Sequence, residues 1–505
     1  MNVNRRTPKF RSITIAAIML TIGLGCLCLP TGITPTSTPT DTQPILPTST
    51  SKSTLPPPAT LPPLPTVTAF NSNAMLYSDG PWLLIETDQG LWALNPDGSG
   101  LTQLTTVDYW NGDLKDAVEP GGRQVVFISP GDYDFHHMAL NILSLPGGQI
   151  TKVTDLTSTQ TETYADSGPG DPGFEALRAI GERRSYAWSP DGSKLAFVGA
   201  MDGPSAELYI YDERLYKVKR VSQDNAQDFA PSWSPDGQHL LYLTADGFGT
   251  GAGMVMSGVW AAAGDGSAAT QLYKSDSSGE EINGWLNNTT ILLDTWSIVC
   301  GPGKLRLYDV VSRQQTMLND GCITSASASG EHSEALFSND SGLYLLTADN
   351  PKPVSVSQEP KARIDPWGPD DYVFKVRFEN GLLATFGSGD IDHQVSPVTA
   401  PAGGSLTPLD DQNVAMYGAI WGWTSQNSAQ PGAWITGPGV EIGQIYPGLA
   451  RFPAWTPDNN LLFFAQADAG GYNIYLTTFD AHYTDLFNVN HLSAEVNNVG
   501  WLGPR

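Results

Sequence analysis

The sequence is poor in basic residues, and this shortage limits the partners it can have. Its 505 residues hold 27 Lys and Arg against 52 Asp and Glu, which gives a formal net charge of −25. Binding to nucleic acid requires a basic face that meets the phosphates. The composition therefore argues against nucleic acid as a partner, and the excess of acid is mainly a source of solubility.

The sequence also lacks the motifs of hydrolytic enzymes. It contains no G-x-S-x-G nucleophile elbow, no nucleophile placed beside a base and no carboxylate pair at a defensible spacing. These absences favour a binding protein over an enzyme, and no cofactor is expected. A hydrolase or lyase that uses acidic and His residues remains the alternative.

Cysteine is scarce, with four residues in the whole chain. Only Cys300 and Cys322 fall in the region that we expect to fold. Outside the cytosol an even pair of cysteines is typical of a disulfide, and both lie in turns expected on the same side of the fold. Two separate buried thiols are the alternative, and two sulfurs without a nearby His do not predict a metal site.

Only one long hydrophobic run is present, from Ile13 to Leu24. Four basic residues precede it, and Gly25-Cys26 ends it, which is the layout of a secretory signal over residues 1–25. Gly25-Cys26 resembles a bacterial lipobox, which implies a lipid on Cys26. An uncleaved apolar anchor and ordinary cleavage are the alternatives, and all three place the protein outside the cytoplasm, attached to the membrane by its N-terminus or secreted.

Residues 26–73 have the composition of a disordered stalk. The stretch from Pro30 to Phe70 holds 11 Pro and 12 Thr among 41 residues, with only Asp41 and Lys52 charged. Such a segment cannot bury a core and favours extended polyproline conformations. At ~3.1 Å per residue, it could span on the order of 100 Å between a membrane and the folded part.

One phrase, W-S-P-D-G, is repeated after this stalk. It stands at Trp188 and again at Trp233, and apolar, alternating segments follow each copy. Ser, Pro, Asp and Gly each suit their place in a type I turn, so the phrase predicts a hairpin and the segments after it predict further strands. One phrase therefore marks one antiparallel meander.

Weaker copies extend the repeat over residues 74–505 at spacings of about 40 to 50 residues, the signature of propeller blades built from four short strands. An orphan copy at Trp501 predicts that the C-terminal strand pairs with the N-terminal blade. The sequence thus predicts an all-β propeller of about eight blades, within seven to nine, with a loop insertion at 155–184. The weaker copies begin at Val118, Trp285, Ala328, Trp367 and Trp455, with a poor one near Leu406.

The phrase W-S-P-D-G, followed by L-A-F and then L-Y-I-Y-D, resembles the TolB-type, WD-repeat-like propeller family. The resemblance implies the fold and is nearly silent on function. It implies a binding platform in the periplasm or at the cell surface, which here would recognise a protein, a peptide or an envelope glycan. Related propellers also cap prolyl-oligopeptidase-type enzymes, but without a G-x-S-x-G elbow in this sequence we do not expect the hydrolase domain of that association. We expect a monomer.

The connections between strands differ in length, and this predicts where a binding site lies. The S-P-D-G turns are short, whereas the connections from second to third strands and from one blade to the next are long, and these should share one face. Candidate binding residues on this face are Asp132, Asp134, His136, His137, Phe248, Trp296, Trp421 and Trp423.

Each candidate has a plainer interpretation. The acidic and His residues at 132–137 lack the spacing of a zinc enzyme, so a solvated loop is expected there and no metal site. The glycine-rich segment around Phe248 is not followed by the helix start of a phosphate-binding loop. Trp421 and Trp423 would point to one side in a strand, where they could stack on a sugar or peptide or pack in the core.

Overall fold

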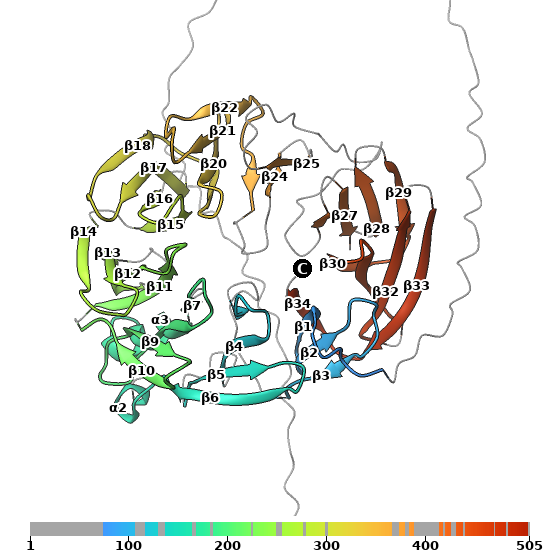
Figure 1. The fold of residues 1–505 in the computed structure, drawn as a ribbon, viewed down its shortest axis with the longest axis horizontal. Helices are drawn as coiled ribbons and strands as arrows, with labels where there is room; N and C mark the ends of the chain where they lie inside the picture. The colour runs from blue at the N-terminus through green and yellow to red at the C-terminus, as the bar shows by residue number, and fades with distance from the viewer. Residues whose placement is uncertain are drawn as a thin grey trace, which may run out of the picture. The chain divides into compact units, whose positions relative to one another are not determined.

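In the computed structural model the regular structure of the described residues is mainly β-strand, grouped in small sheets that follow one another along the chain (Figure 1). All described residues belong to the unit Leu64–Arg505. The structure describes residues 74–106, 117–129, 137–163, 168–181, 185–223, 226–248, 255–275, 279–297, 301–365, 373–378, 383–387, 414–417, 420–425, 431–437, 440–468, 470–480 and 483–502.

Nine antiparallel sheets make up the described part of the chain, seven of four strands and two of three. The all-β class and the four-stranded repeat are therefore confirmed. The number of sheets is one above the expected eight and inside the expected range. Residues 388–413, which join the seventh sheet to the eighth, lie outside the described residues.

The first five sheets include both intact copies of the phrase, in the third and the fourth sheet. The first consists of β1 (Trp82–Thr87), β2 (Gly90–Leu94), β3 (Thr102–Gln103) and β34 (Val496–Leu502). The second consists of β4 (Gln124–Ser129), β5 (Ala139–Ser144) and β6 (Gln149–Asp155). The third consists of β7 (Tyr186–Trp188), β8 (Lys194–Gly199), β9 (Glu207–Asp212) and β10 (Lys217–Arg220). The fourth consists of β11 (Gln227–Trp233), β12 (His239–Gly247), β13 (Val255–Ala263) and β14 (Thr270–Lys274). The fifth consists of β15 (Glu280–Trp285), β16 (Thr290–Ser297), β17 (Gly301–Asp309) and β18 (Gln315–Asn319).

The last four sheets contain the weaker copies at Ala328, Trp367 and Trp455 and the poor one near Leu406. The sixth consists of β19 (Ser325–Ser329), β20 (Glu334–Asn339), β21 (Gly342–Thr347) and β22 (Val354–Ser357). The seventh consists of β23 (Arg363–Ile364), β24 (Val373–Arg377) and β25 (Leu383–Gly387). The eighth consists of β26 (Val414–Tyr417), β27 (Ile420–Ser425), β28 (Gly432–Gly437) and β29 (Val440–Tyr446). The ninth consists of β30 (Ala450–Trp455), β31 (Leu461–Gln466), β32 (Tyr472–Asp480) and β33 (Tyr483–Leu492).

The two ends of the described chain meet in the first sheet, as the orphan copy at Trp501 predicts. Strand β34 pairs antiparallel with β1, and Trp501 lies opposite Leu83. Leu83, Ile85 and Trp501 pack in one hydrophobic cluster with residues of the ninth sheet. The C-terminal strand is therefore an integral part of the N-terminal sheet.

The S-P-D-G turns have the conformation that their residues predict. In both intact copies the glycine N–H donates to the serine carbonyl at 2.8 Å, and Gly192 and Gly237 adopt φ of 69° and 67°. The hydroxyl of Ser189 donates to Asp191 at 2.7 Å and also accepts the N–H of Lys194 at 3.0 Å. A Cβ at the glycine would be strained, which explains why glycine ends the phrase.

The tryptophan of the phrase joins neighbouring sheets. The indole Nε1 of Trp233 donates to the carbonyl of Ala187 at 3.0 Å, and that of Trp188 donates to Ala117 at 3.2 Å. In each case the acceptor directly precedes the first residue of the previous copy of the phrase: Ala187 precedes Trp188, and Ala117 precedes Val118. Trp188 and Trp233 are also 8 % and 7 % exposed, so each fills a core and satisfies its N–H at the same time.

The connections divide into two faces. We call the ends of the strands that carry the first-to-second and third-to-fourth turns the turn face. The loop face carries the second-to-third connections and those leading to the next sheet. As expected, residues 130–138, 248–254 and 298–300 lie between second and third strands, and 156–185 lie between two sheets.

The eighth sheet departs from the expected register. The poor copy near Leu406 predicts that Val414 opens a second strand and that Trp421 lies in the loop after it. Instead β26 begins at Val414 as the first strand, and Trp421 and Trp423 lie within β27. The eroded phrase carries neither the tryptophan nor the turn residues that fix the register elsewhere.

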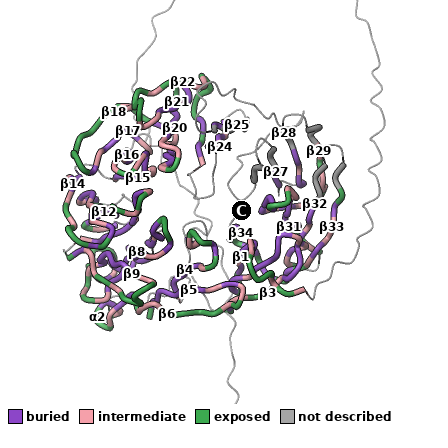
Figure 2. The backbone as a smooth tube through the Cα atoms, viewed as in Figure 1, coloured by how far each residue is buried: buried purple, intermediate pink, exposed green. Residues whose placement is uncertain are grey.

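The insertion holds two helices, α2 (Thr159–Glu162) and α3 (Pro172–Gly181). Neither of these two helices, nor any other helix in the described part of the chain, is long and apolar enough to cross a membrane. The outer strands β6, β18 and β22 contain no buried residue, whereas the strands beside them, β5, β17 and β21, are mostly buried (Figure 2).

Candidate functional site

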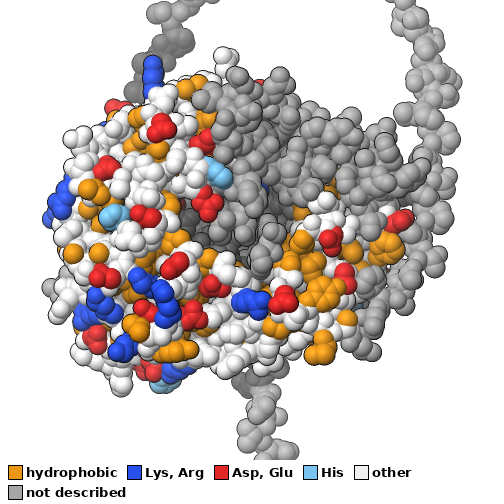
Figure 3. Space-filling view, viewed as in Figure 1, with side chains coloured by type: hydrophobic (Ala, Val, Ile, Leu, Met, Phe, Trp, Pro, Cys, Tyr) orange, Lys and Arg blue, Asp and Glu red, His pale blue; other side chains and the backbone are white. Residues whose placement is uncertain are grey.

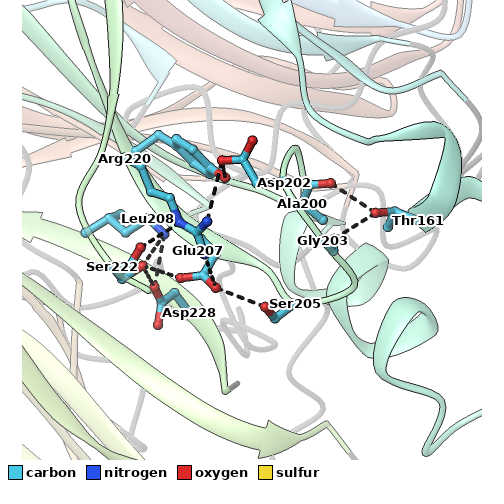
Figure 4. Close-up of polar contacts among 11 residues, drawn as sticks. Thr161, Ala200, Asp202, Gly203, Ser205, Glu207, Leu208, Arg220, Ser222 and Asp228 are labelled. Carbon is cyan, nitrogen blue, oxygen red and sulfur yellow. Dashed lines mark hydrogen bonds and ion pairs between the residues drawn. The ribbon is translucent and has the colours of Figure 1, made fainter. Parts of the chain in front are cut away.

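The insertion is fixed to the loop face at its first helix. The side chain of Ser158 caps α2 by accepting the N–H of Thr161 at 3.1 Å. Thr161 is fully buried, and its hydroxyl lies 3.0 Å from the Ala200 carbonyl and 2.9 Å from that of Gly203 (Figure 4). A parallel bridge between Thr157 and Ala200 adds a backbone contact. The start of the insertion is therefore attached to the connection that follows β8 of the third sheet.

Helix α3 is held by a buried carboxylate, Glu175, which is 2 % exposed. Its Oε1 accepts the N–H of Gly170 at 2.8 Å, and its Oε2 accepts the N–H of Phe248 at 2.7 Å. Each oxygen thus satisfies a backbone donor from a different connection, and hydrogen bonds to a charged acceptor are among the stronger ones in proteins. We call this arrangement the Glu175 clasp, because it joins the insertion to the connection after β12.

Phe248, a candidate binding residue, belongs to this clasp. Its side chain is 4 % exposed and meets Phe229 edge to face, with ring centroids 5.4 Å apart. The guanidinium of Arg178 lies 5.6 Å from the centre of the Phe248 ring. The ring therefore packs inside the protein, and the expectation that Phe248 contacts a ligand is corrected to a role in anchoring the connection.

A second polar network supports the face beside the insertion (Figure 4). Arg220 binds the buried Glu207 at 2.7 Å and reaches the half-exposed Asp202 at 3.6 Å. The Ser222 hydroxyl donates to Glu207 at 2.9 Å and also contacts Asp228. The network thus links the connection after β8 to the connection after β10. It presents a cation and a carboxylate, Arg220 and Asp202, at the surface.

A third network joins the fourth and the fifth sheet. The guanidinium of Arg306 lies 2.8 Å from Glu280 and 2.9 Å from the hydroxyl of Tyr273 in β14; Arg306 and Glu280 are buried, and Tyr273 is partly buried. Burial, followed by the charge of Glu280, raises the pKa of Tyr273. The phenol therefore stays protonated and donates to Glu280 at 2.9 Å.

Asp294, in β16 of the fifth sheet, is a buried carboxyl with a shifted pKa. It is 2 % exposed and lies opposite Glu281 in the pairing of β15 with β16. Burial, followed by the charge of Glu281, raises the pKa of Asp294 to about 7. Such a carboxyl exchanges a proton near neutral pH, which is a property of many active sites. Its burial, however, keeps it from touching a substrate.

The acidic and His cluster is described only at its end. Asp132, Asp134 and His136 lie outside the described residues. The His137 side chain is 85 % exposed, and its Nδ1 lies 3.3 Å from Glu162 of α2. No group of three His, Cys, Asp or Glu residues in the described part of the chain is arranged to hold a metal ion.

Of the tryptophans among the candidate residues, one packs in the core, and the side chains of the other two are not described. Trp423 is 4 % exposed and stacks on Trp434 across β27 and β28, with ring centroids 5.8 Å apart. It packs in the core, the alternative that its sequence left open. Trp296, the last residue but one of β16, lies opposite Pro302, and Trp421 lies opposite Thr436, while the side chains of both tryptophans lie outside the described atoms.

Sequence analysis missed the Glu175 clasp and the network of Arg220 and Glu207. The amphipathic stretch 172–181, with its Pro at the helix start, could have shown α3. Nothing in the spacing pairs Glu175 with Phe248, which is 73 residues away.

Comparisons with known proteins place this architecture beside TolB over part of the chain. No family model matches the chain. Over 113 residues it is 34 % identical to the Tol-Pal system protein TolB of Alcanivorax borkumensis, covering 21 % of this chain and 26 % of that protein. Over 71 residues it is 37 % identical to the uncharacterized peptidase YuxL of Bacillus subtilis, covering 14 % of this chain and 11 % of the relative. The chain thus spans about a quarter or less of the length of these curated relatives.

Solved structures are related more distantly. TolB from Acinetobacter baumannii shares 14 % identity over 56 % of this chain and 65 % of its own, with a TM-score of 0.27. An oligogalacturonate lyase from Vibrio parahaemolyticus shares 12 % over 58 % and 88 %, with a TM-score of 0.33. These TM-scores are too low for either likeness to bear on function. The sheets and the partial identity together make the repeat region of this chain TolB-like.

Proposed function

We propose that this protein is a non-catalytic binding propeller held outside the cytoplasm, and that its loop face recognises a protein partner. The curated relative with 34 % identity is named a Tol-Pal system protein, which favours a protein over the other expected ligands, a peptide or an envelope glycan. Because that identity covers 21 % of this chain, the activities of the whole relative are not transferred to it.

The observation that carries the proposal is the Glu175 clasp. Binding residues must be held in place by a rigid support, and here one carboxylate ties two connections of the loop face together. Val255, the first residue of β13, lies beside this clasp, opposite Gly247, and is 58 % exposed. An exposed apolar side chain near the backbone that Glu175 holds at Phe248 is a suitable centre for a protein contact.

Catalysis is the less favoured function. Asp294, which has the protonation behaviour of a catalytic acid or base, is 2 % exposed. The described acids around the insertion, Glu175 and Glu207, already accept hydrogen bonds from backbone and side chains of the fold. Glu175 and Glu207 therefore stabilise the loop face, and the exposed residues of that face are the ones that would contact a partner.

Attachment to the envelope is part of the proposal. Residues 1–25 serve as a signal, a lipid is carried on Cys26, and residues 26–73 form the stalk. Mass spectrometry of the mature N-terminus tests this: a lipid mass on Cys26 is expected. An unmodified N-terminus, or a Cys26→Ala protein that still fractionates with membranes, contradicts it.

We also propose a disulfide between Cys300 and Cys322. Cys300 lies outside the described residues, but Ile323, next to Cys322, donates its N–H to the Pro302 carbonyl at 3.1 Å. This bond brings Cys322 beside the segment that follows Cys300. Titration of thiols in the unfolded, unreduced chain should find neither cysteine reactive, and two reactive thiols would refute the bridge.

A photo-cross-linking pair tests the binding face. A benzophenone amino acid replaces Val255 on the loop face or, as the control, Val311 on the turn face, which is 64 % exposed. In cells, the variant at Val255 should form a protein adduct that the variant at Val311 does not form. Adducts of the same protein from both positions, or only from Val311, would contradict the proposal.

A further inference from the structure

The carboxyl of Asp294 lies between two sheets, unlike the Asp and Glu side chains on the surface in Figure 3, whose charge water stabilises. Asp294 lies opposite Leu305 of β17, and residues directly opposite each other in an antiparallel pair point to the same face of the sheet. Leu305 packs in one hydrophobic cluster with Ala328 of β19. The face that carries Asp294 is therefore the one that meets the sixth sheet (Figure 1).

The fifth and sixth sheets are packed tightly where they meet. A Cβ added to Gly284 of β15 would lie 2.9 Å from the carbonyl oxygen of Ala328 and 3.4 Å from its Cβ. Ala326 and Ala328 pack against the cluster of the fifth sheet, whereas the hydroxyl of Ser325 donates to the carbonyl of Ala362, next to the seventh sheet. The alanines of β19 thus face β15 and β16. We call this contact between the two sheets the joint.

The strands around Asp294 bring mainly negative charge to its face of the sheet. Strands β15, β17 and β19 pack most closely against β16. Strand β19 holds no charged residue, and the charged residues of the other two are Glu280, Glu281, Lys304, Arg306 and Asp309. Glu281 lies directly opposite Asp294, where two like charges destabilise a sheet. Asp309 ends β17 at the turn face, away from the joint.

Neither cation of β17 compensates this charge. Arg306 directly follows the residue opposite Asp294, so it points to the other face of the sheet, where it binds Glu280 at 2.8 Å. The ammonium of Lys304 pairs with Asp320 at 2.9 Å. A negative charge on Asp294 would therefore be buried, beside a second negative charge and against alanines.

We propose that Asp294 is a pH-sensitive switch that controls the joint between the fifth and sixth sheets. With a proton on its carboxyl, the side chain is neutral and the two sheets stay closed around it. Without this proton, the buried charge favours local separation of β16 from β19, which brings water to the carboxylate. The switch is a property of the fold and does not depend on the proposed partner.

The closed joint should lose stability as the pH rises. Burial, followed by the charge of Glu281, raises the pKa of Asp294 to about 7 in the closed joint, whereas the solvated carboxyl of an open joint has the ordinary value of about 3.8. The opening equilibrium should therefore rise by up to about tenfold per pH unit between these two values and level off above about pH 7. Because β16 ends at Ser297 on the loop face, this end of the loop face should be firmer in acid.

Hydrogen–deuterium exchange of the full chain between pH 5 and pH 8 tests the switch. After correction for the intrinsic effect of pH on amide exchange, the rates report the opening equilibrium. Amides of residues 291–295 and 325–329 should open about fiftyfold more at pH 7 than at pH 5, and those of the S-P-D-G turn at 189–194 should not change. Equal opening of the joint at both pH values, or the same rise in the turn, would overturn the proposal.

Low concentrations of urea separate local opening from unfolding of the whole chain. A local separation of two strands exposes little surface, so urea should hardly change the exchange of the joint. Exchange of the joint that grows with urea as steeply as global unfolding would show that the joint opens only when the chain unfolds, and the switch would be refuted.

Two variants and a control identify the group that holds the proton. Asp294→Asn keeps the volume without the charge, so the opening of the joint should become independent of pH between 5 and 8. Glu281→Gln removes the facing charge, so the pKa of Asp294 should fall and the rise in opening should end at a lower pH. The matched control is Asp340→Asn, at an exposed position of the loop face in the sixth sheet, which should keep the full response.

The Glu281→Gln protein also keeps the test decisive if Asp294→Asn does not fold, because Glu281 is exposed and its replacement leaves the core intact. Melting temperatures establish that each variant is folded. A pH response that persists in Asp294→Asn, or that is unshifted in Glu281→Gln, would assign the proton to another group and overturn the proposal.

Discussion

The turn face and the loop face hold their carboxylates in opposite ways. On the turn face, the hydroxyl of Ser189 donates to Asp191 and lowers the pKa of this carboxyl to about 2. On the loop face, burial and the charge of Glu281 raise the pKa of Asp294 to about 7. Asp191 accepts hydrogen bonds from residues of its own turn, whereas Asp294 lies in a strand and faces Glu281 of the neighbouring strand.

This difference has opposite consequences for stability. A lowered pKa, as for Asp191, contributes stability above the unfolded pKa of about 3.8 that is lost as the pH falls through about 2. A raised pKa, as for Asp294, contributes stability below about 3.8 that is lost as the pH rises through about 7. The turn face thus favours folding at neutral pH, while Asp294 opposes it there.

Both faces depend on the first sheet, so its loss should have the largest effect. Deleting Asn497–Arg505 removes Trp501 and Leu502, which are 8 % and 0 % exposed, from the pairing with β1. We expect a loss of at least about 5 kcal/mol in unfolding free energy, because removal of either buried side chain alone costs about 2–5 kcal/mol. Denaturant unfolding measures this.

The control for this deletion removes only Gly503–Arg505, beyond the end of β34. It should leave stability nearly unchanged. An unchanged unfolding midpoint after the longer deletion would show that the first sheet does not need its C-terminal strand.

Glu175→Ala should damage the loop face alone. The backbone donors of Gly170 and Phe248 lose a charged acceptor inside the protein, at an expected cost of about 3 kcal/mol. Hydrogen exchange should accelerate over the insertion and residues 244–248 and stay unchanged in the S-P-D-G turns. Glu331→Ala, at an exposed position of the turn face, is the control and should change neither region. Equal acceleration on both faces would contradict the separate construction of the two.

Asp294→Asn should remove the pH dependence of the unfolding free energy that Asp294 causes. The amide carries no charge, so at pH 8 the variant should be more stable than the natural protein by on the order of 2 kcal/mol. At pH 3, below the unfolded pKa of about 3.8, the carboxyl is protonated in both the folded and the unfolded chain, so the two proteins should melt at the same temperature. Thermal melting at both pH values checks this, and a variant equally destabilised at both would disprove the raised pKa.

Ser189→Ala should have the smallest effect, about 1 kcal/mol, because it removes local hydrogen bonds of one turn on the turn face. It should also raise the pKa of Asp191, so that acid unfolding begins at a higher pH. Asp191 can be followed by NMR titration. A pKa that stays near 2 would show that Ser189 does not set it.

The repeat could be predicted from the sequence because its turns are local. Ser189, Asp191 and Gly192 lie within four positions, and their preferences agree with the turn that they form. The hydrogen bond from Trp233 to the neighbouring sheet could have been predicted for the same reason, because the phrase fixes the register of the tryptophan. At the poor copy before Val414 the predicted register was wrong, whereas the eroded copies at Trp285 and Ala328 precede second strands as predicted.

The loop-face supports could not be predicted in this way. Glu175 meets Phe248 across 73 positions, and a glutamate in a helix has the same local pattern whether it is solvated or buried. Phe248 and Trp423 appeared as ligand-binding aromatics because exposure is not visible in the sequence. Their burial follows from contacts with Phe229 and Trp434, which lie in other strands.

The most direct test of the account is the effect of a matched pair of substitutions on the affinity for the partner found by cross-linking. Val255→Arg places a charge on the exposed loop-face position beside the Glu175 clasp, and Val311→Arg does the same on the turn face. The account predicts that Val255→Arg raises the dissociation constant at least about tenfold, as expected for a residue at the centre of an interface, and that Val311→Arg leaves it unchanged. An unchanged constant for Val255→Arg, or a larger effect at Val311, would contradict binding on the loop face.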